Sequence, residues 1–270
     1  TLHNTLFPYT TLFRSASINY PEEFVTLYEN IYEVFSKDLK TFKKHLIFTG
    51  DHSSAAAFVG TIKDMHPEES LGVIWIDAHG DLHTPYTTPS GNLHGMPVAN
   101  MLGINNRENK VRIPKEETLL SWEKLKKLGK NQITPKIDPR DLFFIDIRDL
   151  EKEEWDLIDK YKINYTTPDF RKEHGIHRII EQIRNFSSQF DHLYVSFDVD
   201  SLDSTLVKGT GTPVINGLSW HEASKLLQAF WVLPNLKALE VTEINPLRDE
   251  QNQLAHHINL MLKQLEGLNF

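Results

Sequence analysis

The sequence predicts one α/β domain of three layers, in which helices cover both faces of a doubly wound, mostly parallel sheet. Three observations support this fold class. The 270 residues suit one large domain better than two small ones. Short apolar runs alternate with helical patterns along the chain. The apolar runs also lack strict alternation of polar and apolar residues, as expected for parallel strands that are buried on both faces.

The elements follow from these patterns in order. A helix is expected over residues 21–44, because Phe24, Leu27, Ile31 and Leu39 lie near a 3.6-residue period. Buried strands are expected at residues 46–48, 73–76, 142–147, 193–197 and 236–241. Helical patterns separate or follow them at residues 53–63, 151–161, 173–186, 220–230 and 249–265. Residues 103–139 are polar, and we expect them to form a surface excursion or lid.

The composition excludes several functional classes. The formal net charge is −8 and no Lys/Arg-rich run is present, so the chain has no basic footprint for nucleic acid. The absence of cysteine excludes disulfides and thiolate catalysis, and leaves histidines and carboxylates to hold any metal. No stretch reaches the roughly 18 apolar residues of a membrane span. No signal-peptide pattern is present either, so we expect a cytoplasmic protein that does not bind membranes.

The first 15 residues, TLHNTLFPYTTLFRS, differ from the rest of the chain because they show neither helical nor strand periodicity. Residues 5–15 resemble the conceptual translation of a common sequencing-adapter DNA. We therefore expect residues 1–15 to be a non-native leader and residues 16–270 to form the single domain. The alternative is a natural N-terminal strand with a proline turn.

Acidic residues and histidines cluster just after three of the predicted strands. Parallel sheets carry their sites at the carboxyl ends of the strands, and residues two apart in a strand share a face. The side chains of the three clusters should therefore converge. They are His52, Asp77, His79, Asp81, Asp198 and Asp200.

Four carboxylates and two imidazoles cannot gather in one place without cations that offset their charge. Any one of these residues alone would more often be a helix cap or a structural histidine. Three clusters at strand ends instead favour a pair of hard or borderline metal ions, with Mn(II) the first choice. Two such ions about 3.5–4 Å apart can bridge a water and lower its pKa toward neutrality, which creates a nucleophile for a planar, cationic carbon.

Six motifs make this interpretation specific. They are GDHS (50–53), DAHGD (77–81), SGNLHGMP (90–97), SFDVDSLD (196–203), GTGTP (209–213) and EINP (243–246). Together, in this order, they resemble the arginase/agmatinase (ureohydrolase) family over about residues 46–250. The resemblance implies an arginase-like α/β fold, two Mn(II) per chain and a homo-oligomer, trimeric or hexameric. It also implies hydrolysis of L-arginine to L-ornithine and urea by a dinuclear Mn(II) hydroxide.

The resemblance assigns roles to individual residues. The six clustered residues match the metal ligands of the family, and Asp77, Asp81 and Asp198 would contact both ions. His94 matches the histidine that carries protons to the leaving amine, a task that suits an imidazole at neutral pH. Asp81 would accept the proton of the nucleophile.

Two further positions match the residues that hold the guanidinium group. Glu243 matches the carboxylate that grips this group, since a carboxylate pairs well with its planar set of donors. Thr212 matches a residue that helps to hold this glutamate.

The loop SGNLHG resembles that of arginases rather than agmatinases. Ser90 and Asn92 match positions that hydrogen-bond the α-carboxylate of the substrate, which agmatine lacks. Asp149, Glu151 and Glu154 lie where arginases place acidic residues near the α-amino group. L-Arginine is therefore the expected substrate. Agmatine, another guanidino acid, or an inactive metal-binding remnant of such an enzyme remain the alternatives.

The chain departs from the family pattern in places. His83 stands where arginases often carry an Asn that contacts the α-carboxylate, although a histidine can still donate a hydrogen bond. Glu151 replaces a more usual Asp. Few residues precede His52, so we expect the first strand of the sheet to be missing, which would expose a sheet edge and a hydrophobic face. The choice among Mn, Co and Ni stays open.

Overall fold

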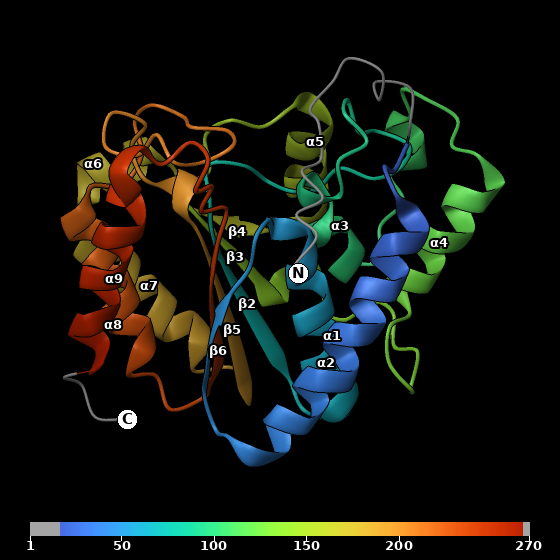
Figure 1. Ribbon diagram of the computed structural model, residues 1–270, viewed down its shortest axis with the longest axis horizontal. Helices are drawn as coiled ribbons and strands as arrows, with labels where there is room; N and C mark the ends of the chain where they lie inside the picture. Colours follow the sequence, from blue (N-terminus) through green and yellow to red (C-terminus); the bar gives the residue numbers. More distant parts are fainter. Residues whose placement is uncertain (1–16, 267–270) are drawn as a thin grey trace.

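A six-stranded parallel sheet forms the middle layer of the computed structural model, which describes residues 17–266 (Figure 1). The strands lie in the order β1-β6-β5-β2-β3-β4, and all five neighbouring pairs are parallel. Their bounds are β1 His45–Phe48, β2 Leu71–Ile76, β3 Leu142–Ile145, β4 Asn164–Tyr165, β5 His192–Asp198 and β6 Leu236–Thr242. The predicted three-layer α/β fold is confirmed.

Helices cover both faces of this sheet, as Figure 1 shows. One layer contains α1 (Pro21–Thr41), α2 (Ala55–Met65), α3 (Pro97–Met101), α4 (Glu116–Lys126) and α5 (Lys152–Tyr161). The other layer contains α6 (Pro168–His174), α7 (Ile176–Ser187), α8 (Trp220–Trp231) and α9 (Gln253–Glu266). No helix within residues 17–266 is both long and apolar enough to cross a lipid bilayer.

Strand β2 explains why the predicted strands are apolar without alternation. Val73 and Trp75 pack into the hydrophobic core beneath α1 and α2. Ile74 and Ile76 point the other way, into the core shared with α7, α8 and α9. Both faces of the strand are thus removed from water, and every residue of β2 is buried.

Local signals set the ends of several helices. Pro21 occupies the first turn of α1, where its missing N–H costs no hydrogen bond. Ser219 caps α8 by accepting from the backbone N–H of Glu222, whose carboxylate accepts in turn from the backbone N–H of Ser219. Gly175 adopts φ 76° and divides the helix predicted over residues 173–186 into α6 and α7.

Residues 103–139 do not form the predicted surface excursion or lid, and this expectation was wrong. They contain α4, which packs against α1. Its Trp122 and Leu125 belong to the hydrophobic core and are almost fully buried. Glu116, Glu117 and Lys124 of this helix hid its narrow apolar stripe, because they lie on the face that remains in water.

Strand β1 is an edge of the sheet and, among the described residues, pairs only with β6. Its side chains alternate between half-buried and exposed positions, and Leu46 and Phe48 are 38% and 58% exposed. An apolar sheet edge is therefore accessible within residues 17–266. Residues 1–15, the predicted leader, lie outside the described part of the chain. The prediction of a missing strand stays a prediction.

Candidate metal centre

The six predicted metal ligands converge at the carboxyl edge of the sheet. Asp77 follows β2 directly, and Asp198 is the last residue of β5. His52 begins a short 3-10 turn after β1, and Asp200 lies in a similar turn after β5. Because these strands are parallel, their carboxyl ends bring residues that are up to 148 positions apart to one place.

His52 lies at the centre of the first ligand cluster. Its Nδ1 is 3.1 Å from an oxygen of Asp77, 3.1 Å from one of Asp81 and 3.2 Å from one of Asp198. All four side chains are buried. The ligand atoms of His52, Asp77 and Asp81 lie within 4.8 Å of one another, as the ligands of one metal ion do, and Asp198 adjoins them through its contact with His52.

His79 forms the second cluster. Its Nδ1 lies 3.3 Å from Oδ1 of Asp77 and 3.2 Å from Oδ2 of Asp200. Asp77 therefore presents Oδ2 to the first cluster and Oδ1 to the second. A carboxylate shared in this manner places two cation sites side by side.

The electrostatics of the centre call for positive charge. Burial lowers the pKa of His52, but the carboxylates of Asp198, Asp77 and Asp81 outweigh burial and raise that pKa well above its ordinary value. Burial itself raises the pKa of Asp198, and the neighbouring carboxylates raise it further. Like charges this close destabilise one another unless protons or cations are bound.

Two polar atoms of the first cluster fit a metal ion. Nδ1 of His52 and Oδ2 of Asp81 are fully buried and make no hydrogen bond. Buried polar atoms are rarely left without a partner, so each such atom calls for an explanation. An ion bound between these two atoms supplies one, and the donor set of one imidazole with several carboxylates suits Mn(II).

A chain of hydrogen bonds, not predicted from the sequence, fixes the tautomer of His52. Ser196 Oγ donates to Glu240 Oε2 over 2.7 Å and thus accepts from Nε2 of His52, also over 2.7 Å. With the proton on Nε2, the lone pair of Nδ1 faces the cluster. Trp75 stacks on the imidazole with 4.0 Å between ring centroids and an interplanar angle of 8°. Ser196 lies within SFDVDSLD, but nothing near Glu240 in the sequence signals this role.

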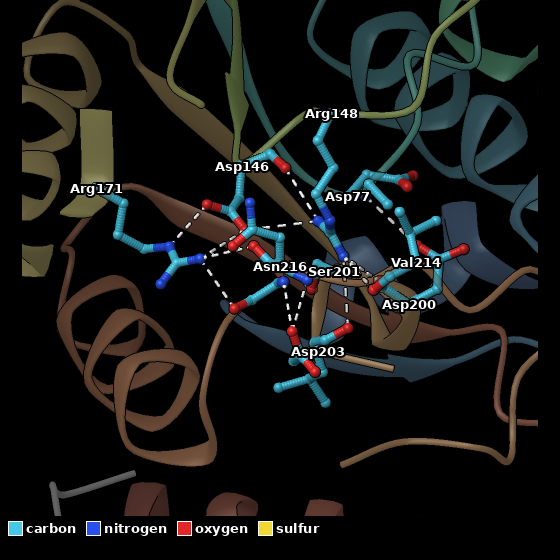
Figure 2. Close-up of polar contacts among 12 residues, drawn as sticks. Asp77, Asp146, Arg148, Arg171, Asp200, Ser201, Asp203, Val214 and Asn216 are labelled. Carbon is cyan, nitrogen blue, oxygen red and sulfur yellow. Dashed lines mark hydrogen bonds and ion pairs between the residues drawn. The ribbon is translucent and has the colours of Figure 1, made fainter. Parts of the chain in front are cut away.

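The turn that carries Asp200 is held by two buried arginines, shown in Figure 2. Nη2 of Arg148 donates to the backbone carbonyls of Asp200 at 2.9 Å and Val214 at 3.3 Å, and Nη1 donates to that of Asp146 at 3.0 Å. Arg171 donates through Nε to Oδ1 of Asp146 at 2.8 Å. The bond from Arg148 to Asp200 satisfies a carbonyl of the turn itself, and its bonds to Asp146 and Val214 join the turn to neighbouring segments of the chain.

Two site residues adopt a left-handed backbone that is uncommon for residues other than glycine. Asp81 has φ 50° and Glu243 has φ 64°. Such conformations cost on the order of 1–3 kcal/mol each and persist where the surrounding structure enforces them. Between His79 and Asp81, Gly80 leaves room for Leu150, because a Cβ atom there would lie 2.8 Å from Cδ2 of that side chain and force it to shift.

His94 and Glu243 line the same cavity as the two ligand clusters. Nδ1 of His94 lies 3.7 Å from Oε1 of Glu243, which accepts a hydrogen bond of 3.0 Å from the backbone N–H of His52. Burial raises the pKa of Glu243 to about 7, although the nearby His94 opposes this rise. A cation in the cavity would favour the ionised form of this carboxylate.

His83, Glu151 and Glu154 form one wall of the cavity. Nε2 of His83 lies 3.1 Å from Oε2 of Glu151 and 3.7 Å from Oε2 of Glu154. Glu154 is buried and accepts from the backbone N–H groups of Leu82 and Glu151, at 3.0 and 3.1 Å. Glu154 therefore ties the start of α5 to the loop of the metal ligands, in addition to lining the cavity.

The remaining predicted residues take different positions. Ser90 and Asn92 line the cavity. The side-chain oxygen of Asn92 accepts a hydrogen bond of 2.8 Å from the side-chain amide of Asn19. Asp149 does not line it; its side chain is 67% exposed and lies 3.8 Å from Nε2 of His79. Thr212 does line the cavity, but its hydroxyl donates to Oδ2 of Asp200 over 2.9 Å. The hydroxyl thus supports a metal-ligand candidate rather than the glutamate for which it was predicted.

The fold and the site together define an α/β protein whose His/Asp clusters could hold two neighbouring metal ions in a polar cavity. A sequence profile of the arginase family matches residues 11–265. Arginase from Bacillus subtilis (strain 168) is 33% identical over 240 residues, which cover 88% of this chain and 74% of that protein. Arginase from Entamoeba histolytica is 31% identical over 204 residues, which cover 75% of this chain and 62% of that protein.

Comparison of structures agrees. A crystal structure of E. histolytica arginase in complex with L-ornithine has a TM-score of 0.81 and 25% identity, covering 93% of this chain and 79% of that one. The chain therefore belongs to the arginase family. This membership places it among the hydrolases that act on C–N bonds of linear amidines.

Proposed function

We propose that this protein hydrolyses L-arginine to L-ornithine and urea with two Mn(II) ions bound by His52, His79 and the four aspartates. The observation that carries the proposal is the position of Glu243 and His94 in one cavity with two ligand clusters that share Asp77. When bound, the two ions would supply an activated water near neutral pH. One imidazole per cluster among several carboxylates supports Mn(II) over softer ions.

The side chains of the cavity have distinct tasks in this proposal. The carboxylate of Glu243 accepts hydrogen bonds from the guanidinium group and orients its carbon toward the activated water. Asp81 accepts the proton that the attacking water loses. His94, which is partly exposed, donates a proton to the departing amine and regains it from solvent. Each transfer uses a group that already faces the cavity.

Other residues that line the cavity support an amino-acid substrate. Ser90 and Asn92 offer a hydroxyl and an amide to an α-carboxylate, and Glu151 offers a negative charge to an α-ammonium group. His83 lies beside Glu151 and is a second donor for the carboxylate. The E. histolytica relative was crystallised with L-ornithine, which is the amino-acid product of the proposed reaction.

The test is urea release from L-arginine and from agmatine, measured side by side with Mn(II)-reconstituted protein. We expect urea from L-arginine and little from agmatine, which lacks the carboxylate that Ser90 and Asn92 would bind. The Glu243→Gln variant is the matched control, since it keeps the shape of the side chain but loses the charge that pairs with guanidinium. Urea from agmatine alone would refute the amino-acid part of the proposal. No urea from either substrate, with Mn(II) bound, would refute the activity.

A further inference from the structure

A second group of histidine and carboxylate side chains lies at the end of the sheet opposite the candidate active site. His192 is the first residue of β5, and Glu69 precedes the first residue of β2 by two positions. His66 follows the last residue of α2. Because β2 and β5 are parallel neighbours, their first residues lie at the amino edge of the sheet, whereas the Asp77 and Asp198 clusters lie at the carboxyl edge.

The three side chains of this group face one another. Nδ1 of His66 lies 3.3 Å from Oε1 of Glu69, and Nε2 of His192 lies 2.5 Å from Oε2 of the same carboxylate. The two imidazole rings are in contact, with 4.3 Å between their centroids. One nitrogen from each histidine and one carboxylate oxygen thus lie within 4.8 Å of one another.

Hydrogen bonds between the two chain segments hold this arrangement in place. The backbone N–H of His192 donates to the carbonyl of Ser70 over 3.0 Å. Asp191 accepts from both the backbone N–H and the hydroxyl of Ser70, at 2.8 and 2.7 Å. The backbone N–H of Glu69 donates to the carbonyl of His66 over 3.2 Å. Little backbone movement is then needed to bring the three side chains onto a ligand.

The unsatisfied nitrogen of His192 points to such a ligand. His192 is 7% exposed, and its Nε2 makes no hydrogen bond of normal geometry despite its short distance to Glu69. An imidazole binds a metal through a ring nitrogen that carries no proton, and the buried Nε2 of His192 is a candidate for such a donor atom.

We propose that His66, Glu69 and His192 bind one Zn(II) ion. Two imidazoles and one carboxylate are ligands that zinc accepts, and solvent can supply the fourth position because Glu69 is half exposed. The richer nitrogen content distinguishes this site from the carboxylate-rich clusters at the opposite edge, which favour harder ions. The bound ion would join the loop between α2 and β2 to the start of β5, and so stabilise the fold.

The test is the amount of Zn(II) retained by Mn(II)-loaded protein after dialysis against buffered zinc. The wild-type protein should retain one more equivalent of zinc than His66→Ala, a variant of a partly exposed side chain. His174→Ala is the matched control, because His174 also lies near a glutamate, Glu173, but belongs to no group of three metal-ligand side chains among residues 17–266. Zinc that replaces manganese at the catalytic clusters would be equal in all three proteins and would cancel from the difference.

Thermal stability in zinc and the EPR spectrum of bound Cu(II) provide two further tests of this site. Zinc at about 100 times its dissociation constant should raise the Tm of wild-type protein by about 5 °C and leave His66→Ala unchanged. Cu(II) bound in place of zinc should show EPR splitting from two nitrogens, and Glu69→Gln should bind it more weakly. Equal zinc retention by wild type, His66→Ala and Glu69→Gln would overturn the proposal.

Discussion

The orientation of His52 depends on residues that do not face the cavity. The hydroxyl of Ser196 accepts a hydrogen bond from Nε2 of His52 and donates one to the carboxylate of Glu240. The same carboxylate also accepts hydrogen bonds from the hydroxyls of Tyr194 and Thr49, at 2.8 and 2.9 Å. Such partners of a metal-binding imidazole fix its tautomer and raise its basicity. The geometry of the candidate site thus depends on residues outside the cavity as well as on those that line it.

Replacing Ser196 by alanine should therefore weaken Mn(II) binding by about 10–100-fold, because Nε2 of His52 loses its acceptor. Titration of the metal-free protein with Mn(II) measures this change. Ser188→Ala is the control, since its hydroxyl bonds only a nearby carbonyl at the exposed end of α7. An unchanged dissociation constant for Ser196→Ala would show that the hydrogen-bond chain does not tune the histidine.

His94 is expected to act in proton transfer without holding a metal. The His94→Ala variant should lose about 100-fold or more of kcat, as is typical when a positioned proton donor is removed, while its Mn(II) content stays at the wild-type level. Turnover and metal content are to be measured on the same preparation. Partial rescue of turnover by added imidazole would support the assignment, and an undiminished rate would contradict it.

Lys136 is a buried lysine whose Nζ donates to the carbonyl of Leu128 over 2.6 Å. Burial lowers its pKa from 10.5 to about 8, although Asp64 opposes this. Between these two pH values the unfolded chain binds more protons than the folded one, so the free energy of unfolding rises with pH. Below about pH 8 both states are protonated, and the buried charge costs on the order of 3 kcal/mol.

The Lys136→Met variant should consequently have a higher free energy of unfolding than the wild type at pH 7, by up to about 3 kcal/mol. Its advantage should shrink as the pH rises from 8 toward 10.5, because the wild-type lysine then loses its charge. Urea denaturation of both proteins at pH 7 and pH 9.5 measures the difference. A difference that does not change between the two pH values would show that desolvation of the charge is not the cause.

Among the secondary-structure elements, β1 is the one that we expect to promote aggregation. It offers one edge without a partner among residues 17–266, and Leu46 and Phe48 expose apolar surface there. An exposed, apolar sheet edge can pair with another chain and promote aggregation. The same strand leads into His52 by way of Gly50 and Asp51, so its position also matters for the metal centre.

The Phe48→Lys variant should remain monodisperse at concentrations where the wild type associates, because a charge on an edge strand opposes pairing with a second edge. Light scattering at increasing concentration compares the two proteins. The variant should keep its Tm within about 2 °C, since the Phe48 side chain is mostly in solvent. Lys43→Ala is the control, because this residue lies just before the strand and its replacement adds no charge to the strand. Equal association of wild type and Phe48→Lys would show that this edge is not responsible.

At the scale of the whole molecule, the candidate metal centre opposes folding unless protons or cations are bound. Asp77, Asp81, Asp198 and Asp200 are buried in the two adjoining ligand clusters, where several segments of the chain meet. Their mutual repulsion destabilises the folded state, whereas the unfolded chain separates them. Metal ions that bind these clusters would therefore stabilise the folded state.

Removal of metal by a chelator should lower the Tm, and readdition of Mn(II) at about 100 times its dissociation constant should raise it again by about 5 °C for each ion. Scanning calorimetry of chelated and reconstituted protein measures the effect. The Asp200→Asn variant should show a smaller rise, because one cluster loses a charged ligand. A Tm that does not depend on Mn(II) would exclude a tightly bound ion in either cluster.

The fold class and the metal-ligand candidates could be predicted because they depend on local information. Apolar runs of strand length indicate buried strands. Charged residues that directly follow such a strand necessarily lie at the carboxyl edge of a parallel sheet. The helix α4 within residues 103–139 could not be predicted, because its burial depends on a contact with a distant segment of the chain. The apolar stripe of α4 is narrow, and only its contact with α1 shows that Trp122 and Leu125 belong to the core.

The sequence by itself thus determined the alternation of strands and helices, the family resemblance and the six residues that converge at the sheet edge. Only the tertiary structure decided which atoms meet. It showed that Asp77 faces both clusters, that Thr212 supports Asp200, and that Ser196 and Glu240 orient His52. It also brought His66 and Glu69 to His192, more than 120 positions away. Periodicity and motifs report the neighbours of a residue along the chain, whereas hydrogen bonds and ligand geometry depend on segments that become neighbours only when the sheet assembles.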